Sequence, residues 1–143
     1  MSTIGPPTSM QLAHELREAV GRVVRRLRAE PGPSVGRMAV LGRLDREGPS
    51  SISDLAARER MRPQSMAQTV HDLETGGLVS RRPDPADRRR HFIELTPAGL
   101  DLLQATRSRR EGWLAEVLER ELDADERALV QEALVLLHRI ADA

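Results

Sequence analysis

Two short helical segments that almost adjoin place the tightest limit on this fold. The first, Ser51–Arg60, begins with Ser51 and Asp54 at the spacing of a capping box. The second, Arg62–Gly77, has a proline where the first helical turn tolerates one, and either of its two final glycines can supply the left-handed residue that ends it. A connection this short is typical of a helix-turn-helix corner.

The second segment has two chemically different faces. Met66, Val70 and Leu73 fall at positions i, i+4 and i+7, which predicts one buried apolar stripe. The other face carries side chains that are small or fork-shaped and nearly all form hydrogen bonds: Arg62, Gln64, Ser65, Gln68, Thr69 and Asp72. Such side chains can recognise base edges in the major groove of DNA. The same pattern also fits a helix face that only contacts solvent, so the neighbouring segments must decide.

The chain after this helix has the pattern of a β-hairpin with a basic tip. Residues 78–82 and 91–95 are typical of strands, and the prolines and aspartates of residues 83–90 predict the loop between them. Three adjacent arginines occupy residues 88–90 of this loop. A helix-turn-helix followed by such a hairpin predicts a winged helix. Without that neighbour, the arginine run would fit a solvated turn equally well.

Two more helices are predicted before this unit and two after it. They begin at the Thr8, Ser34, Thr96 and Asp123 caps. The first extends to about Ala29, the second runs through Leu44 and ends at Gly48-Pro49, and the third extends to about Glu121. Gly112, inside the third, marks either a bend or a close contact. The first and last carry more apolar surface than a small winged helix can cover, and such surfaces usually form interfaces. A two-fold dimer is the commonest arrangement, and a larger monomeric core that uses both helices is the alternative.

The composition is that of a globular protein without disulfides or thiolate metal sites. The length of 143 residues predicts one domain, and the chain contains no cysteine. We expect a cytoplasmic protein, because neither a secretion signal nor a membrane-spanning apolar run is recognisable. The formal net charge of zero argues by itself against nucleic-acid binding. The charges are unevenly placed, however, since residues 81–91 hold five arginines and two aspartates, whereas residues 111–143 hold nine acidic residues and three arginines.

Other functional classes find less support in the residues. The four histidines lack a second ligand at metal spacing, and neither a glycine-rich phosphate loop nor a serine nucleophile elbow is present, so we expect no enzyme, metal or cofactor. A binder of single strands would stack bases on aromatic rings, but the chain has one Phe, one Trp and no Tyr. A winged helix that binds only protein is the remaining alternative, in which three adjacent arginines would be unfavourable to bury. Double-stranded DNA is therefore the predicted partner.

Four short motifs occur in order along the chain. They are Asp54-Leu55-Ala56, Leu73-Glu74-x-x-Gly77-Leu78-Val79-x-Arg81, Asp87-Arg88-Arg89 and Leu95-Thr96-Pro97-Ala98-Gly99. Together they resemble the MarR family of bacterial transcription regulators, over essentially the whole chain. The resemblance implies a mainly α (α+β) winged helix-turn-helix in a single domain of residues 1–143, with a DNA-binding lobe at about residues 34–96. It also implies that helices in about residues 9–30 and 97–143 intertwine with those of a second subunit.

The resemblance further implies regulation, usually repression, that a small phenolic or other aromatic anion relieves. Such a ligand would bind between the winged helix and the helical dimerisation region. Arg22, Met38 and Trp113 can line such a cleft, although packing and surface charge explain the three residues as well. The Asp-x-Arg pattern of the family matches Asp87 and Arg89, where the aspartate would orient the arginine.

The predicted DNA contacts come from the second helix of the motif and from the wing. The candidate residues are Arg62, Pro63, Gln64, Ser65, Gln68, Thr69, Asp87, Arg88, Arg89 and Arg90. The two glutamines, the serine and the threonine would lie at or near base edges, where a glutamine can pair with adenine. Arg62 and the N-terminal N–H groups of the Ser51–Arg60 helix would hold phosphates. The wing would reach a minor groove. Arg88 and Arg90 would contact either the groove or phosphates, and which of the three arginines enters the groove is left open. Two subunits would bind a near-palindrome with half-sites roughly 34 Å apart.

Overall fold

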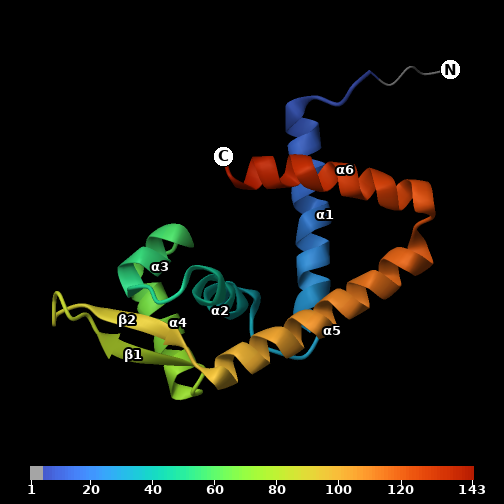
Figure 1. Cartoon of the computed structure of the whole chain (residues 1–143). Coiled ribbons are helices and arrows are strands. Elements are labelled where there is room, and N and C mark those ends of the chain that lie inside the picture. Colours follow the sequence, from blue (N-terminus) through green and yellow to red (C-terminus); the bar gives the residue numbers. More distant parts are fainter. Residues whose placement is uncertain (1–4) are drawn as a thin grey trace. The chain divides into compact units, whose positions relative to one another are not determined.

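Six helices and one two-stranded hairpin form the part of the chain that the structure describes. The computed structural model describes residues 5–143. Its elements are α1 (Ser9–Ala29), α2 (Val35–Glu47), α3 (Ile52–Arg58), α4 (Pro63–Thr75), β1 (Val79–Pro83), β2 (His91–Leu95), α5 (Pro97–Glu121) and α6 (Ala124–Ala141) (Figure 1). Contacts divide the chain into two compact units, one ending at Thr106 and one comprising Arg107–Ala143. The predicted class, a mainly helical winged helix with a small antiparallel sheet, is confirmed.

The predicted caps explain where three of the helices begin. At α1, Thr8 Oγ1 accepts a hydrogen bond from the Gln11 N–H (3.2 Å), and Gln11 Oε1 accepts one from the Thr8 N–H (2.9 Å). Asp123 and Glu126 exchange the same pair of bonds at α6, both at 2.8 Å. Ser34 Oγ accepts an N–H of the first turn of α2 (3.2 Å). These three predictions are confirmed.

The start and end of α3 differ from the prediction. Ser51 Oγ accepts the Asp54 N–H (3.2 Å), but the Asp54 carboxylate accepts from Arg90 of the wing, so only half of the predicted capping box forms. The helix ends at Arg58 instead of Arg60, because Arg60 has a left-handed φ of 52°. The predicted end of α2 at Gly48 is confirmed, since this glycine is its C-cap, whereas β1 begins one residue later than predicted.

The hydrophobic core belongs to the winged helix. Side chains that are at most 3% exposed come from α2, α3, α4, both strands and the start of α5: Val40, Leu41, Leu44, Leu55, Ala56, Met66, Val70, Leu73, Val79, Ile93 and Leu103. The predicted apolar stripe of α4 is confirmed, because Met66, Val70 and Leu73 are all buried. Burial of this stripe leaves the polar side chains of the same helix on the opposite face, toward solvent.

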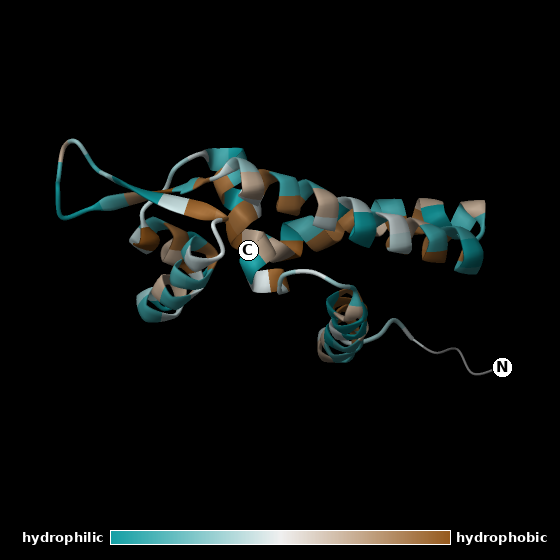
Figure 2. Ribbon diagram, turned by 90° about the horizontal axis from the view of Figure 1, so that it is seen from below, coloured by the Kyte–Doolittle hydropathy of each residue, from teal (hydrophilic) through white to brown (hydrophobic). Residues whose placement is uncertain are grey.

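The hairpin is fastened to the helix-turn-helix at its base. β1 and β2 pair antiparallel, with Val79 opposite Leu95. Ser50, just before α3, exchanges two backbone hydrogen bonds with Ile93 of β2, at 3.1 and 2.8 Å. Figure 2 shows the hairpin changing from hydrophobic near the core to hydrophilic along its loop. The wing therefore combines a base anchored in the core with a polar tip.

Two glycines allow the end of α4, the start of β1 and the start of α5 to approach closely. Gly77 has a φ of 73°, so it is the left-handed residue, and Gly76 is not. A Cβ at Gly99 would lie 2.1 Å from the Leu78 carbonyl oxygen, which no side chain tolerates. Thr96 Oγ1 closes the junction, since it donates to the Gly77 carbonyl (2.7 Å) and accepts the Gly99 N–H (3.0 Å). Of the two alternatives for Gly112, a close contact finds no support within the described residues of this chain, because a Cβ there would meet no atom from outside its own stretch of helix within 4 Å.

The terminal helices carry large hydrophobic side chains on their surfaces. Among residues 5–143, neither α1 nor α6 contains a buried residue. The exposed large hydrophobic residues of the described chain lie in these two helices: Met10, Leu12, Val20, Val23, Leu129, Val130, Leu134, Val135, Leu136 and Ile140. None of the described helices combines the length and apolar character that crossing a membrane requires.

Candidate nucleic-acid interface

The polar face of α4 presents the predicted recognition residues to solvent. Arg62 is the N-cap of the helix, and Pro63 is its first residue. Along the face, Thr69 is half-buried and the other predicted residues are exposed: Arg62, Pro63, Gln64, Ser65 and Gln68. Because the opposite side of the helix is packed into the core, these side chains extend from a fixed backbone.

Hydrogen bonds orient several of these side chains before any partner binds. Thr69 Oγ1 donates to the Ser65 carbonyl oxygen (3.1 Å). Gln68 Nε2 donates to Asp72 Oδ1 (2.9 Å), and Arg37 of α2 donates through Nη2 to Oδ2 of the same carboxylate (3.0 Å). One carboxylate thus connects a predicted base-reading side chain to the neighbouring helix.

Two aspartates build the turn of the wing. Asp84 Oδ1 accepts the Ala86 N–H (2.8 Å), and Asp87 Oδ1 accepts the Arg89 N–H (3.0 Å). Asp87 therefore orients the backbone of Arg89, whereas the sequence pattern left open which part of the arginine it would hold. The side chains of Arg88 and Arg89 are exposed at the tip.

Arg90 is bound to the helix-turn-helix. Its Nη2 donates to Ser51 Oγ (3.1 Å) and to Asp54 Oδ2 (2.7 Å) at the start of α3. Its guanidinium carbon also lies 5.8 Å from the centroid of the Phe92 ring, and that of Arg82 lies 5.6 Å from the same centroid. The two hydrogen bonds fix the wing relative to the start of α3, and the ring contacts lie within the wing.

A basic hollow of about 230 Å³ lies where the wing meets the start of α3. Its lining combines basic side chains and hydroxyl groups with one isoleucine: Ser51, Ile52, Ser53, Arg81, Arg89, Arg90 and His91. Glu74 of α4 neutralises Arg81 (2.6 Å), and Asp54 neutralises Arg90. Arg89 then supplies positive charge to a site that suits one anionic oxygen group.

A separate ionic cluster joins α2 to α3. Arg43 donates to Glu59 (2.6 Å) and to Glu47 (2.9 Å), and Arg58 also pairs with Glu47. The hydrogen bond to the Glu59 carboxylate raises the pKa of Arg43 above its ordinary value, so this guanidinium stays charged. The cluster braces the helix-turn-helix without involving any predicted recognition residue.

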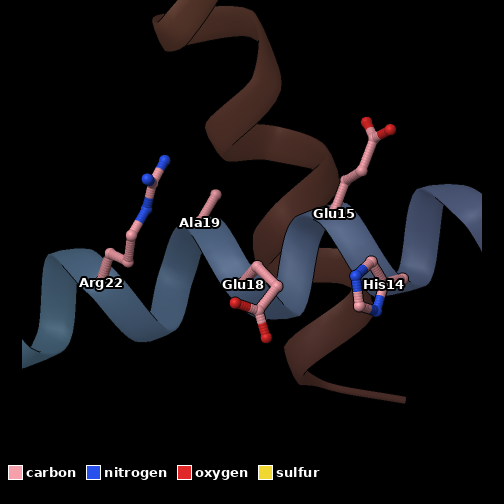
Figure 3. A pocket seen from close by; sticks show the side chains of 5 residues that line it. All are labelled: His14, Glu15, Glu18, Ala19 and Arg22. Atoms are coloured by element: carbon pink, nitrogen blue, oxygen red, sulfur yellow. The ribbon is translucent and has the colours of Figure 1, made fainter.

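The three residues predicted to line a ligand cleft lie in different surroundings. Arg22 borders a hollow of about 410 Å³ on α1. The other residues that line it are His14, Glu15, Glu18 and Ala19 (Figure 3). Met38 packs against the winged-helix core, and Trp113 is half-buried in the Arg107–Ala143 unit. The ligand cleft therefore stays a prediction.

Sequence reasoning missed the side chains that hold the recognition residues in place. Arg37 lies 35 residues from Asp72, and Asp54 lies 36 residues from Arg90, so no local pattern indicates either pair. The bond from Gln68 to Asp72 is different, because its i, i+4 spacing on one helix is a recognisable signal.

Comparisons with known proteins agree with this geometry. A family model described as MarR family matches residues 32–90. An uncharacterized HTH-type transcriptional regulator of Mycobacterium leprae is 34% identical over 135 residues, which cover 92% of this chain and 94% of the relative.

Solved structures are similar over nearly the whole chain. A Pseudomonas aeruginosa protein described as a transcriptional regulator is 38% identical, with a TM-score of 0.77, over 96% of this chain and 99% of that one. The PcaV transcriptional regulator from Streptomyces coelicolor, solved in complex with its natural ligand, is 26% identical, with a TM-score of 0.65, over 100% of this chain and 99% of its own.

Proposed function

Because this chain belongs to the MarR family of HTH-type transcriptional regulators, we propose that it acts as a homodimer that represses transcription from a palindromic operator. The chain is a DNA-binding transcription regulator, and the proposal adds the dimer, the operator symmetry and the direction of regulation. One observation carries it. The exposed polar face of α4 and the arginine-bearing wing extend from a single core, so one lobe can contact a major groove and a flanking minor groove together.

In this proposal, α4 lies in the major groove. Gln64, Ser65, Gln68 and Thr69 contact base edges or lie beside them, and a glutamine amide matches adenine through two hydrogen bonds. Arg62 and Pro63 stand at the start of the helix, where a guanidinium and the helix N-terminus favour a phosphate. The exposure of these residues on one packed helix supports the assignment.

The wing reaches the flanking minor groove through its tip. We assign Arg88 and Arg89 to direct DNA contact, because their side chains are exposed, whereas Arg90 is engaged with Ser51 and Asp54 and serves to position the wing. Asp87 contributes indirectly by fixing the Arg89 backbone. The basic hollow beside the wing has the charge and hydroxyl groups to hold one backbone phosphate.

The apolar surfaces of α1 and α6 support the proposed dimer. Large hydrophobic residues on these helices are 38–79% exposed in the single chain, which is unfavourable unless a second surface covers them. A second copy of the chain offers the same surface, so an isologous interface is the simplest solution. Two copies would then present two α4 helices to half-sites roughly 34 Å apart.

We further propose that a small aromatic or phenolic ligand releases the operator. PcaV is a regulator with a natural ligand, which makes ligand control a reasonable expectation for a relative of similar fold. Titrating aromatic carboxylates into a preformed protein–DNA complex tests this part, and a ligand that acts should lower operator affinity without unfolding the protein.

The decisive experiment is a gel shift of the purified protein on the DNA upstream of its own gene, with competitor DNA and a series of salt concentrations. A sequence-specific shift of dimer size whose affinity falls steeply with salt is the expected result. Reporter expression that rises when the gene is deleted would establish repression. Binding that is absent, or equally weak on every sequence, would favour the alternative of a winged helix that binds only protein.

A further inference from the structure

We propose that Asp72 is a positioning residue that fixes the Gln68 amide so that it recognises adenine, and that Arg37 holds Asp72 in place. The proposal rests on the proposed function, since it assumes that α4 reads an operator. It goes further by naming a residue that sets specificity without touching DNA, and by assigning the adenine contact to Gln68.

The geometry is a chain of three side chains. Asp72 lies one helical turn after Gln68, and its Oδ1 accepts the Gln68 Nε2–H at 2.9 Å. Its Oδ2 accepts the Arg37 Nη2–H at 3.0 Å. Each oxygen of the carboxylate therefore has its own donor, and the carboxylate is held from two helices.

The chemistry of a carboxylate determines which end of the amide faces it. An ionised carboxylate can only accept hydrogen bonds, so Gln68 must turn its nitrogen, not its oxygen, toward Asp72. One N–H is then used, and the carbonyl oxygen and the second N–H remain available to a base. That pair matches the N6–H donor and the N7 acceptor of adenine in the major groove.

Arg37 also solves an electrostatic problem. A carboxylate on the DNA-facing side of α4 would repel phosphates, and the neighbouring guanidinium compensates for its charge. The Arg37 and Asp72 side chains are 45% and 36% exposed, so solvent screens the pair and its contribution to folding is small. Its main effect is on the orientation of Gln68.

The expected effect on recognition comes from side-chain freedom. A glutamine that is already oriented loses less conformational entropy when it binds a base, and releasing it should weaken discrimination about two- to tenfold. The loss should fall on one base pair in each half-site, whereas affinity for unrelated DNA should not fall.

The test uses the full-length protein, first on its operator and then on operators in which each base pair is replaced in turn. In Asp72→Ala and Asp72→Asn, we expect the preference for adenine at one position to fall by this factor. Asparagine keeps an oxygen for Arg37 but can also present its amide nitrogen to Gln68, which frees the orientation. In a Gln68→Ala background, Asp72→Ala should cause no further loss of preference.

Glu74→Gln is the matched control. It removes one negative charge from the same helix, but Glu74 pairs with Arg81 and not with a base-facing side chain. We expect this variant to raise affinity for all sequences alike. If Asp72→Asn did the same and kept the preference for adenine, the carboxylate would be only a charge and the proposal would be overturned.

A second measurement does not need DNA. In the free protein, the side-chain amide resonances of Gln68 should shift in Asp72→Ala, and unchanged resonances would also overturn the proposal. A wild-type protein that binds no specific site would instead refute the proposed function. Specific wild-type binding together with an unaffected Asp72→Ala variant would refute only the positioning role.

Discussion

The winged-helix core buries its hydrophobic side chains, whereas the two terminal helices expose theirs to solvent. In the core, side chains from six elements meet, and Leu41, Leu55 and Met66 are completely buried. In α1 and α6, Leu12 and Leu129 are 54% and 64% exposed, although both helices begin with complete capping boxes. The local signals that favour a helix are thus as strong in the terminal helices as elsewhere. The difference is that no other part of the described chain buries their apolar side chains.

This difference separates recognition from assembly. The winged helix buries its core within one chain, so its reading face can be positioned before DNA or a second subunit arrives. The terminal helices have surfaces that one chain leaves open, and they gain most of their stabilisation from packing against another surface. Substitutions in the two regions should therefore fail in different ways.

The largest effect is expected from Leu134→Asp in α6. This residue belongs to the exposed apolar side of the helix and borders a small hollow with Leu118 and Val130. In a dimer, each new carboxylate would be buried without a partner, which would destabilise the dimer by about several kilocalories per mole. We expect monomers by light scattering at concentrations where the wild type is dimeric.

Ala128→Asp is the matched control for this substitution. This exposed residue of α6 receives the same charge but lies on the polar side of the helix, with Glu132 and Arg139. It should leave the dimer intact. A Leu134→Asp protein that stays dimeric would contradict the assignment of α6 to the interface.

Met66→Ala should have the next largest effect, and it acts within one chain. Met66 is fully buried on α4, so truncation should lower the free energy of unfolding by about 2–5 kcal/mol. Chemical denaturation would measure this loss. The corresponding change on α1, Leu12→Ala, should lower the free energy of unfolding by less, and this loss should depend on protein concentration. If the two variants lost the same free energy of unfolding, the winged helix and the terminal helices would not differ in the way proposed.

The fold was largely predictable because it depends on local patterns. Caps at Thr8, Ser34 and Asp123 involve residues three positions apart, and the α4 stripe repeats with the helical period. One exception has a tertiary cause, since the Asp54 carboxylate binds Arg90 of the wing and so completes no capping box. The left-handed residue that ends α4 was narrowed to two glycines, and it is Gly77.

The candidate site was only partly predictable. Periodicity identifies which side of α4 is exposed, and composition identifies the tip of the wing. Neither indicates which side chains are already engaged, because those contacts cross between elements. Arg81 is held by Glu74, and Arg90 by residues of α3, so of five basic wing residues the sequence could not tell which were available to DNA.

Gln64→Ala tests the polar face of α4 and should have an effect of intermediate size. Gln64 is exposed in the first turn of α4, where truncation should not disturb the core or the dimer. We expect specific operator binding to weaken by about 1–3 kcal/mol, with a much smaller loss on unrelated DNA. Competition gel shifts would measure both. A uniform loss on every sequence would move Gln64 from the bases to the phosphate backbone.

The smallest effect should come from Arg89→Ala at the tip of the wing. The backbone of Arg89 is held by Asp87, but its side chain is exposed, so removing the guanidinium should leave the unfolding transition unchanged. Operator affinity should fall by on the order of 1 kcal/mol, about fivefold, and the salt dependence should lose about one unit of slope. Arg120→Ala removes another exposed positive charge, at the end of α5, and should change neither the operator affinity nor the salt dependence. If both variants weakened binding equally, the effect would come from the overall charge of the protein. The wing would then not be part of the surface of the winged helix that recognises DNA.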